Sequence, residues 1–129
     1  MIGVDAAQRS FCIAFAFLSG EAEEDYLWAL ERLKALYEQC NASLPSVILT
    51  DRCLAVMNVA SALFPSAVTL ICIWHANKAV LTRCQPAFLE AEAWKEFYNS
   101  WHSIINSLTQ EDYTKRLAEL QQKYLPQHL

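Results

Sequence analysis

Apolar runs and polar breaks divide the chain into segments that predict strands. Residues 11–18 (FCIAFAFL) are uninterrupted apolar, and residues 67–73 (AVTLICI) nearly so. Runs of this length are typical of strands buried on both faces of a sheet. Residues 46–50 form a third, shorter strand pattern, and the apolar residues 1–5 precede a turn at residues 8–10. We expect the strands over 11–18, 46–50 and 67–73 to be neighbours in one sheet.

Between and after these runs, apolar residues recur with helical spacing. Residues 21–39 predict an amphipathic helix, and the acids at its start complement the positive end of the helix dipole. Residues 54–63 predict a second helix that stops near Pro65. Residues 74–78 predict the start of a third helix. Beyond Pro86 the pattern is helical over residues 88–101 and 109–124, with Thr109 and Asp112 approximating a capping box.

The order of these elements predicts the fold class and one candidate site. Strands that first follow one another and then alternate with helices indicate an α/β fold, a mixed sheet with packed helices, followed by a helical C-terminal part. Ligands of such sheets gather at the carboxyl ends of the strands. Asp51 follows the strand predicted over residues 46–50, which makes it the first candidate. An aspartate in this place is also commonly a helix N-cap.

Composition and charge narrow the class of protein. The 129 residues, 54% of them apolar, suit one domain with a buried core. The net charge of −4 lacks the basic footprint of a free-standing DNA-binding module. Five cysteines, an odd number without a disulfide framework, favour a reducing intracellular setting. No signal peptide or membrane-spanning run is visible, so we expect no membrane partner.

Several segments together resemble the MULE (Mutator-like element) transposase domain, in the family's order and near its spacing. They are residues 14–21, 26–30, 47–52, 55–58, 64–65 and 72–78. The resemblance covers roughly residues 3–83 and implies an RNase H-like fold. It implies a partial core over residues 1–85 and, over residues 86–129, the start of a helical insertion.

The resemblance implies a chemistry and an incomplete site. The family cuts and joins DNA with two divalent ions, Mg²⁺ or Mn²⁺, held by three acids. Asp51 matches the second acid and would be catalytic and metal-binding. The first acid and its strand are expected to precede Met1, and the third to follow a helical insertion. We therefore expect the chain to be inactive alone, to expose apolar edges and to self-associate. The resemblance also implies DNA as partner and a nuclear location.

Other chemistry-bearing residues have structural interpretations as well. Cys72 and His75 form a C-x-x-H pair that the family also carries, and His75 could contact DNA or order the site. A zinc set completed by Cys84 and His102 is the less favoured alternative, since such a site needs four ligands. The remaining candidates are Lys78 and Arg83 as possible DNA contacts, Asp5 as a turn residue, the acids of residues 21–25 as a helix start, and the four tryptophans as packing anchors.

Two classes of function remain open at this point. The first is a fragment of a Mutator-like DNA transposase. The second is a domesticated transposase-derived module that keeps the fold for DNA or protein contact. An acid-bearing strand encoded upstream and a glutamate-bearing helix encoded downstream would indicate a transposase fragment. Intact transcripts that start at Met1 would indicate a domesticated module.

Overall fold

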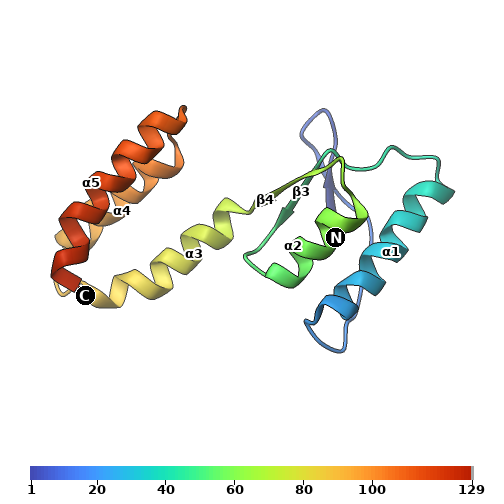
Figure 1. Cartoon of the computed structure of the whole chain (residues 1–129), viewed down its shortest axis with the longest axis horizontal. Coiled ribbons are helices and arrows are strands. Elements are labelled where there is room, and N and C mark those ends of the chain that lie inside the picture. Colours follow the sequence, from blue (N-terminus) through green and yellow to red (C-terminus); the bar gives the residue numbers. More distant parts are fainter. Residues whose placement is uncertain (129) are drawn as a thin grey trace. The chain divides into compact units, whose positions relative to one another are not determined.

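A computed structural model describes the backbone of residues 1–128 and the side chains of residues 1–125 (Figure 1). The chain divides into two compact units, Met1–Ala76 and Asn77–Leu129, with the boundary inside one helix. Its elements are β1 (Ile2–Val4), β2 (Ser10–Cys12), α1 (Glu23–Gln39), β3 (Val47–Thr50), α2 (Leu54–Leu63), β4 (Val68–Ile71), α3 (Ile73–Cys84), a 3₁₀ turn η1 (Gln85–Ala87), α4 (Ala91–Ile105) and α5 (Gln110–His128). Over the described residues, this confirms a mixed α/β chain with five helices. No described helix is long and apolar enough to cross a membrane.

The first unit contains two separate two-stranded sheets. β1 and β2 form an antiparallel hairpin in which Ile2 lies opposite Cys12. β3 and β4 pair in parallel, with Val47 opposite Val68 and Thr50 opposite Ile71. The single sheet expected from the sequence is therefore wrong for this structure. Backbones pair only at about 5 Å, and no ladder among the described strands joins the hairpin to β3.

The strand predicted over residues 11–18 is also too long. The hairpin register places Met1 opposite Ile13, and the amide of Ile13 donates to the Met1 carbonyl at 3.0 Å. The Met1 ammonium donates to the carbonyl of Ala14 at 2.6 Å. The residues after Ala14 lie beyond the reach of β1, so the ladder stops although their side chains favour a strand.

The helices of the first unit pack on each other and bury its core. α1 and α2 lie against one another, and α2 also contacts β3 and β4. The buried apolar side chains of this unit are those of Ala29, Val59, Ala60 and Phe64. All but Ala29 belong to α2 or to its C-cap, Phe64. The predicted helix over residues 54–63 is confirmed with the same bounds.

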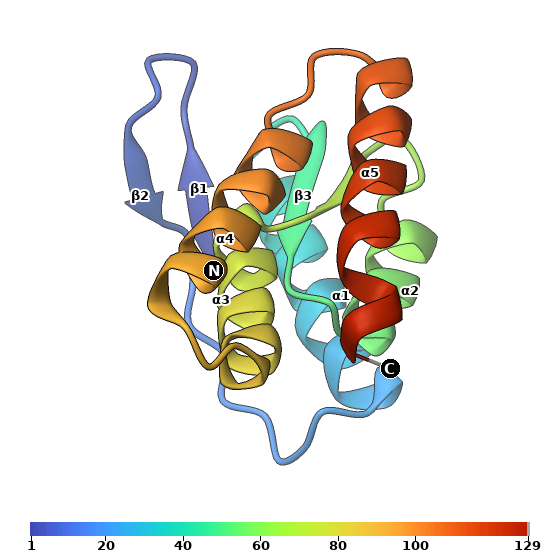
Figure 2. The same cartoon turned by 90° about the vertical axis from the view of Figure 1, so that its left-hand side faces the viewer.

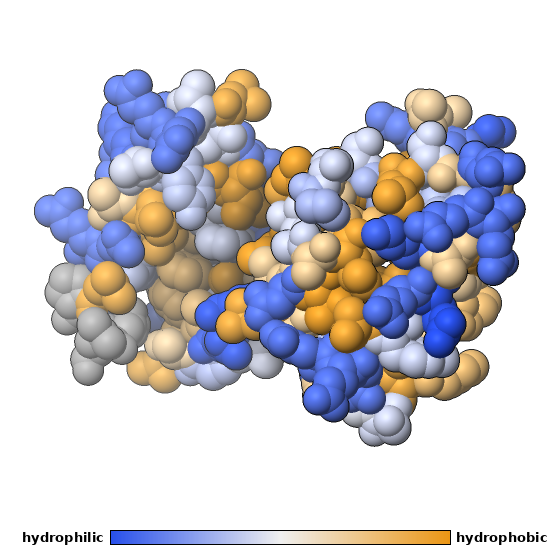
Figure 3. Space-filling model, turned by 45° about the vertical axis from the view of Figure 1, so that its right-hand side comes forward, coloured by the Kyte–Doolittle hydropathy of each residue, from blue (hydrophilic) through white to orange (hydrophobic). Residues whose placement is uncertain are grey.

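The strands, in contrast, are not buried on both faces. Val47 and Leu49 of β3 lie beside Val68 and Leu70 of β4 in the ladder, and all four side chains are exposed. The expectation of doubly buried strands over residues 11–18 and 67–73 is thus wrong. Phe11, Phe15 and Phe17 are exposed as well, and among the described helices α2 makes the main contact with β3 and β4. Figure 3 shows apolar side chains gathered on one face of the unit formed by residues 1–76.

The second unit is helical, as the sequence predicts. α4 and α5 pack side by side (Figure 2). Phe97 and Ile104 are buried, and Phe88 and Tyr124 pack against Phe97 with ring centroids 5.1 Å away. The hydroxyl of Thr109 accepts the amide of Asp112 at 3.1 Å, which confirms the predicted cap of α5.

The tryptophans divide between the two units in their packing. Trp94 stacks on Phe97 at 5.6 Å, and the Trp101 indole donates to Asn77 at 2.8 Å, so these two are packing anchors as expected. Trp28 and Trp74 are 52% and 60% exposed, so these two do not lie in the core.

Candidate functional site

Asp51 stands immediately after β3, at the carboxyl end of the parallel strand pair. One of its carboxylate oxygens accepts the amide of Cys53 at 3.1 Å, and the Thr50 hydroxyl donates to its carbonyl at 2.7 Å. These local bonds shape the turn from β3 into α2. Asp51 is exposed, and its other carboxylate oxygen makes no recorded bond among the described residues. The side chain therefore combines a turn-forming role with a carboxylate oxygen available to a ligand.

Cys72 and His75 follow β4 at the same end of the sheet. The Cys72 amide donates to the Thr50 carbonyl at 2.7 Å, which extends the parallel ladder by one step and brings Cys72 beside the β3 terminus. α3 begins at Ile73, so His75 lies in its first turn and is exposed. Its ring packs edge-on against Trp74 at 4.8 Å. The structure thus places the acid and the C-x-x-H pair on adjacent strand ends, as the sequence predicted.

Sequence reasoning missed one neighbour of this region. The Tyr26 hydroxyl, on α1, lies 3.9 Å from the Cys53 Sγ. Burial, followed by the contact with Cys53, raises the pKa of Tyr26 to about 12. A contact between residues 27 positions apart leaves no local pattern in a sequence, and only the packing of α1 on α2 reveals it.

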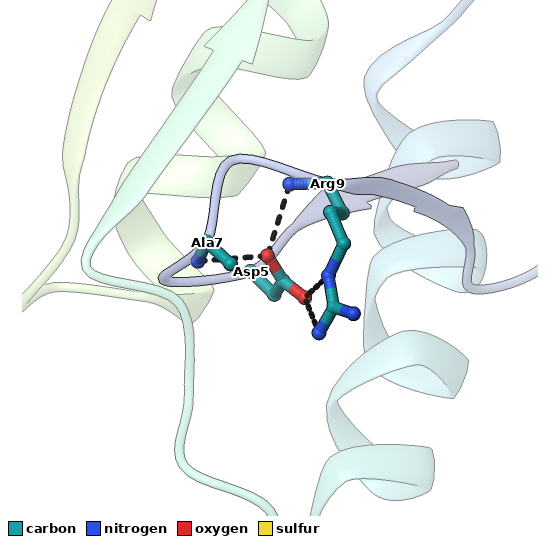
Figure 4. A network of polar contacts seen from close by, with 3 residues as sticks. All are labelled: Asp5, Ala7 and Arg9. Carbon is teal, nitrogen blue, oxygen red and sulfur yellow. Dashed lines mark hydrogen bonds and ion pairs between the residues drawn. The ribbon is translucent and has the colours of Figure 1, made fainter.

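Asp5 holds the tip of the β1–β2 hairpin (Figure 4). One carboxylate oxygen accepts the amides of Ala7 and Arg9 at 2.9 Å each, and the other accepts the Arg9 guanidinium at 2.8 Å. The Arg9 amide, followed by its guanidinium, lowers the pKa of the Asp5 carboxyl. Both oxygens are engaged, so the interpretation of Asp5 as a turn residue is confirmed.

The acids at the N-terminal end of α1 stabilise the start of that helix. Glu23, Glu24 and Asp25 form its first turn, where they complement the dipole. Asp25 accepts the Ala22 amide at 3.0 Å and the Ser19 hydroxyl at 3.2 Å. Glu23 accepts the Asn58 side-chain amide at 2.7 Å and so links α1 to α2. The helix-start interpretation of this cluster is confirmed.

The described residues do not by themselves form a two-metal centre. Within the part of the chain that the structure describes, no three His, Cys, Asp or Glu side chains gather closely enough to hold a metal ion. Asp51 supplies an oxygen ligand of the kind that Mg²⁺ prefers, but two ions need further carboxylates. His102, considered above for a zinc set, packs edge-on against Tyr98 at 4.5 Å.

The candidate DNA contacts and the surface hollows involve residues other than Asp51, Cys72 and His75. Lys78 and Arg83 are exposed on α3, in the second unit. Two surface hollows are described, one between residues 14–17 and α1 and one between α4 and α5. Asp51 lines neither of them, so its exposure is that of an open strand end.

Comparison with known proteins identifies the family of the chain. No solved structure matches the chain. Over 80 residues it is 30% identical to a segment of a protein named PKS-NRPS hybrid synthetase cheA from Chaetomium globosum. That alignment covers 62% of this chain and 2% of the synthetase, so it concerns one small part of a very long protein. The model of the MULE transposase domain matches residues 1–79, which include β1 to β4, Asp51, Cys72 and His75. The chain belongs to the MULE transposase domain family.

Proposed function

We propose that this chain is a central part of a DDE transposase core and that Asp51 is the second metal-binding acid. The observation that carries the proposal is the position of Asp51. Its exposed carboxylate stands at the carboxyl end of a parallel strand, beside the Cys72 amide that bonds to Thr50, and within the family match. Ligands of open α/β sheets bind at such strand ends.

The metal requirement explains why the chain alone is expected to be inactive. The DDE transposases of this family use divalent metals. Two ions about 4 Å apart activate the attacking oxygen and stabilise the leaving one. Asp51 would hold one side of such a pair, and one carboxylate cannot bridge and charge-balance both ions. We therefore expect neither DNA cleavage nor strand transfer by the 129-residue chain in Mg²⁺ or Mn²⁺.

The architecture proposed for the whole core is RNase H-like. Residues 1–85 would supply part of its sheet and residues 86–129 the start of a helical insertion. A central strand with the first acid, lying between the hairpin and β3, would join the two sheets that are separate here. DNA would be the substrate, in the nucleus, with Lys78 and Arg83 as phosphate contacts and Cys72 and His75 ordering the site.

A metal titration tests the role of Asp51. Mn²⁺ broadens the NMR signals of nuclei near its binding site, and we expect weak binding centred on the amides of Asp51, Cys53 and Cys72. Asp51→Asn should remove this broadening. Asp112→Asn is the matched control, because Asp112 is also an exposed aspartate but lies outside the proposed site, in the first turn of α5. Broadening that survives Asp51→Asn would contradict the assignment.

A nicking assay tests the reaction. A longer chain that adds the family's two other acids should nick DNA with Mg²⁺, and Asp51→Ala should abolish the activity. Nicking by the isolated chain, lost on Asp51→Ala, would show that the remaining acids are already among these residues.

The second candidate function is a domesticated binding module, and the exposed apolar strands favour it. Side chains such as Phe15, Phe17 and Leu49, between 63% and 95% exposed, suit a protein partner better than DNA. This function predicts that the longer chain stays inactive while the 129-residue chain binds a protein.

A further inference from the structure

A contact from α1 reaches the turn that carries Asp51. The bonds recorded for Asp51 itself are local, because its carboxylate accepts the Cys53 amide at 3.1 Å and its carbonyl accepts the Thr50 hydroxyl at 2.7 Å. Cys53 is the N-cap of α2 but makes no side-chain capping bond. Its thiol instead donates to the hydroxyl of Tyr26, on α1, at 3.9 Å. The same residue therefore touches α1 with its side chain and the acid with its amide.

We propose that Tyr26 is a positioning residue for Asp51. Its hydroxyl holds the Cys53 thiol, and the Cys53 amide holds one oxygen of the Asp51 carboxylate, which leaves the other oxygen for a ligand. Partners outside the ligand shell orient metal-binding side chains and so strengthen the binding of the metal. The inference rests on the proposed function of Asp51 as a metal-binding acid.

The N-terminal part of α1 is fixed against α2, so it can support the turn. The two helices pack against one another (Figure 1). Glu23 accepts the side-chain amide of Asn58 on α2 at 2.7 Å. Tyr26 lies three residues after Glu23, so the two side chains are neighbours on one face of α1. Both reach α2, Glu23 at Asn58 and Tyr26 at the N-cap.

The Tyr26 hydroxyl remains protonated near neutral pH and feels the charge of Asp51. Partial burial raises the pKa of Tyr26 most, the contact with Cys53 adds to it, and the negative charges of Glu21 and Asp51 raise it further, to about 12. The neutral hydroxyl is a suitable acceptor for the thiol proton. Since it lies behind Cys53 and is half-buried, it suits support of the acid better than contact with a substrate.

Amide hydrogen exchange in the 129-residue chain tests the inference without metal. Tyr26→Phe keeps the ring and removes the hydroxyl. Because a thiol–hydroxyl bond is weak, the protection factor of the residue-53 amide should fall by only about two- to threefold. Cys53→Ala should lower it by a similar factor. The double variant should lose no more than either single variant, because all three lack the same contact.

Asn58→Ala is the matched control, since it breaks the link between α1 and α2 at Glu23 without touching Cys53. It should leave the protection of the residue-53 amide unchanged. Urea unfolding of the same variants gives their global stability. A structural role of Tyr26 alone would lower the protection of all slowly exchanging amides of the unit in step.

A Mn²⁺ titration separates this inference from the proposed function. Where the native chain shows broadening at Asp51, Tyr26→Phe should weaken the binding by about two- to threefold, and Asn58→Ala should not. A native chain without broadening at Asp51 contradicts the metal-binding role, while the exchange result still decides whether Tyr26 positions the acid.

Three results would overturn the inference. They are unchanged protection of the residue-53 amide in Tyr26→Phe, additive losses in the double variant, and a Mn²⁺ affinity that stays the same although this protection is lost.

Discussion

Phe64→Ala is the sharpest test of where the stability of the first unit resides. Phe64 is 2% exposed at the C-cap of α2, beside the fully buried Ala60. Replacing a buried phenylalanine by alanine costs about 3–5 kcal/mol through lost transfer free energy and the cavity left behind. A unit of this size has a free energy of unfolding of roughly 4–11 kcal/mol. The substitution should therefore remove a large share of it.

Phe17→Ala is the matched control, since the same side chain is deleted where it is 95% exposed. Its cost should stay within about 0.5 kcal/mol. Urea unfolding followed by circular dichroism, below the concentrations at which copies associate, measures both. If Phe17→Ala costs as much as Phe64→Ala, or Phe64→Ala costs less than about 1 kcal/mol, the core is not where the structure places it.

Three further predictions concern titration and capping. The pKa of Tyr26 is raised to about 12, so the stability that the neutral Tyr26 side chain contributes is complete below the unfolded pKa of about 10. This contribution should be lost as the pH rises from about 10 through 12. The urea midpoints of the native chain and of Tyr26→Phe should converge in this range. Because the pKa of Asp5 is lowered from 3.8, the hairpin should be stable above that pH and loosen below it, as its amide shifts would report. Asp5→Asn should remove this acid dependence. Asp25→Ala should cost about 1 kcal/mol through lost capping, whereas Glu24→Ala, in the same helical turn, should cost only a few tenths. Equal costs for these two would indicate a pure dipole effect.

The sequence predicted the helices well because their signals are local. The period of apolar residues, the acids at the start of α1 and Pro65 after α2 depend only on neighbours along the chain. α2 has the predicted bounds, and α1 begins two residues later than expected. Thr109 caps α5 as its spacing with Asp112 predicted.

The strands were predicted less well because a strand needs a partner. Residues 13–18 have the composition of a strand, yet pairing ends where Met1 is reached. The position of Asp51 after β3 could be predicted from the strand pattern, and the pairing of Thr50 with Ile71 then brings Cys72 beside it. The contact of Tyr26 with Cys53 could not, because it depends on how α1 packs.

The mismatch between apolar composition and exposure is itself informative. Val47, Leu49, Val68 and Leu70 are more than two-fifths exposed, although aliphatic side chains in adjacent strands ordinarily lie under a covering layer. Because burying such a face is favourable by about 25 cal/mol per Å², any strand or helix that covers it gains stability from residues already in place. The polar residues at the strand ends gain nothing from such cover. The same sheet thus carries two kinds of surface: an apolar one that favours association with protein, and at Asp51 a polar one that, under the proposed function, would need further carboxylates to hold metal.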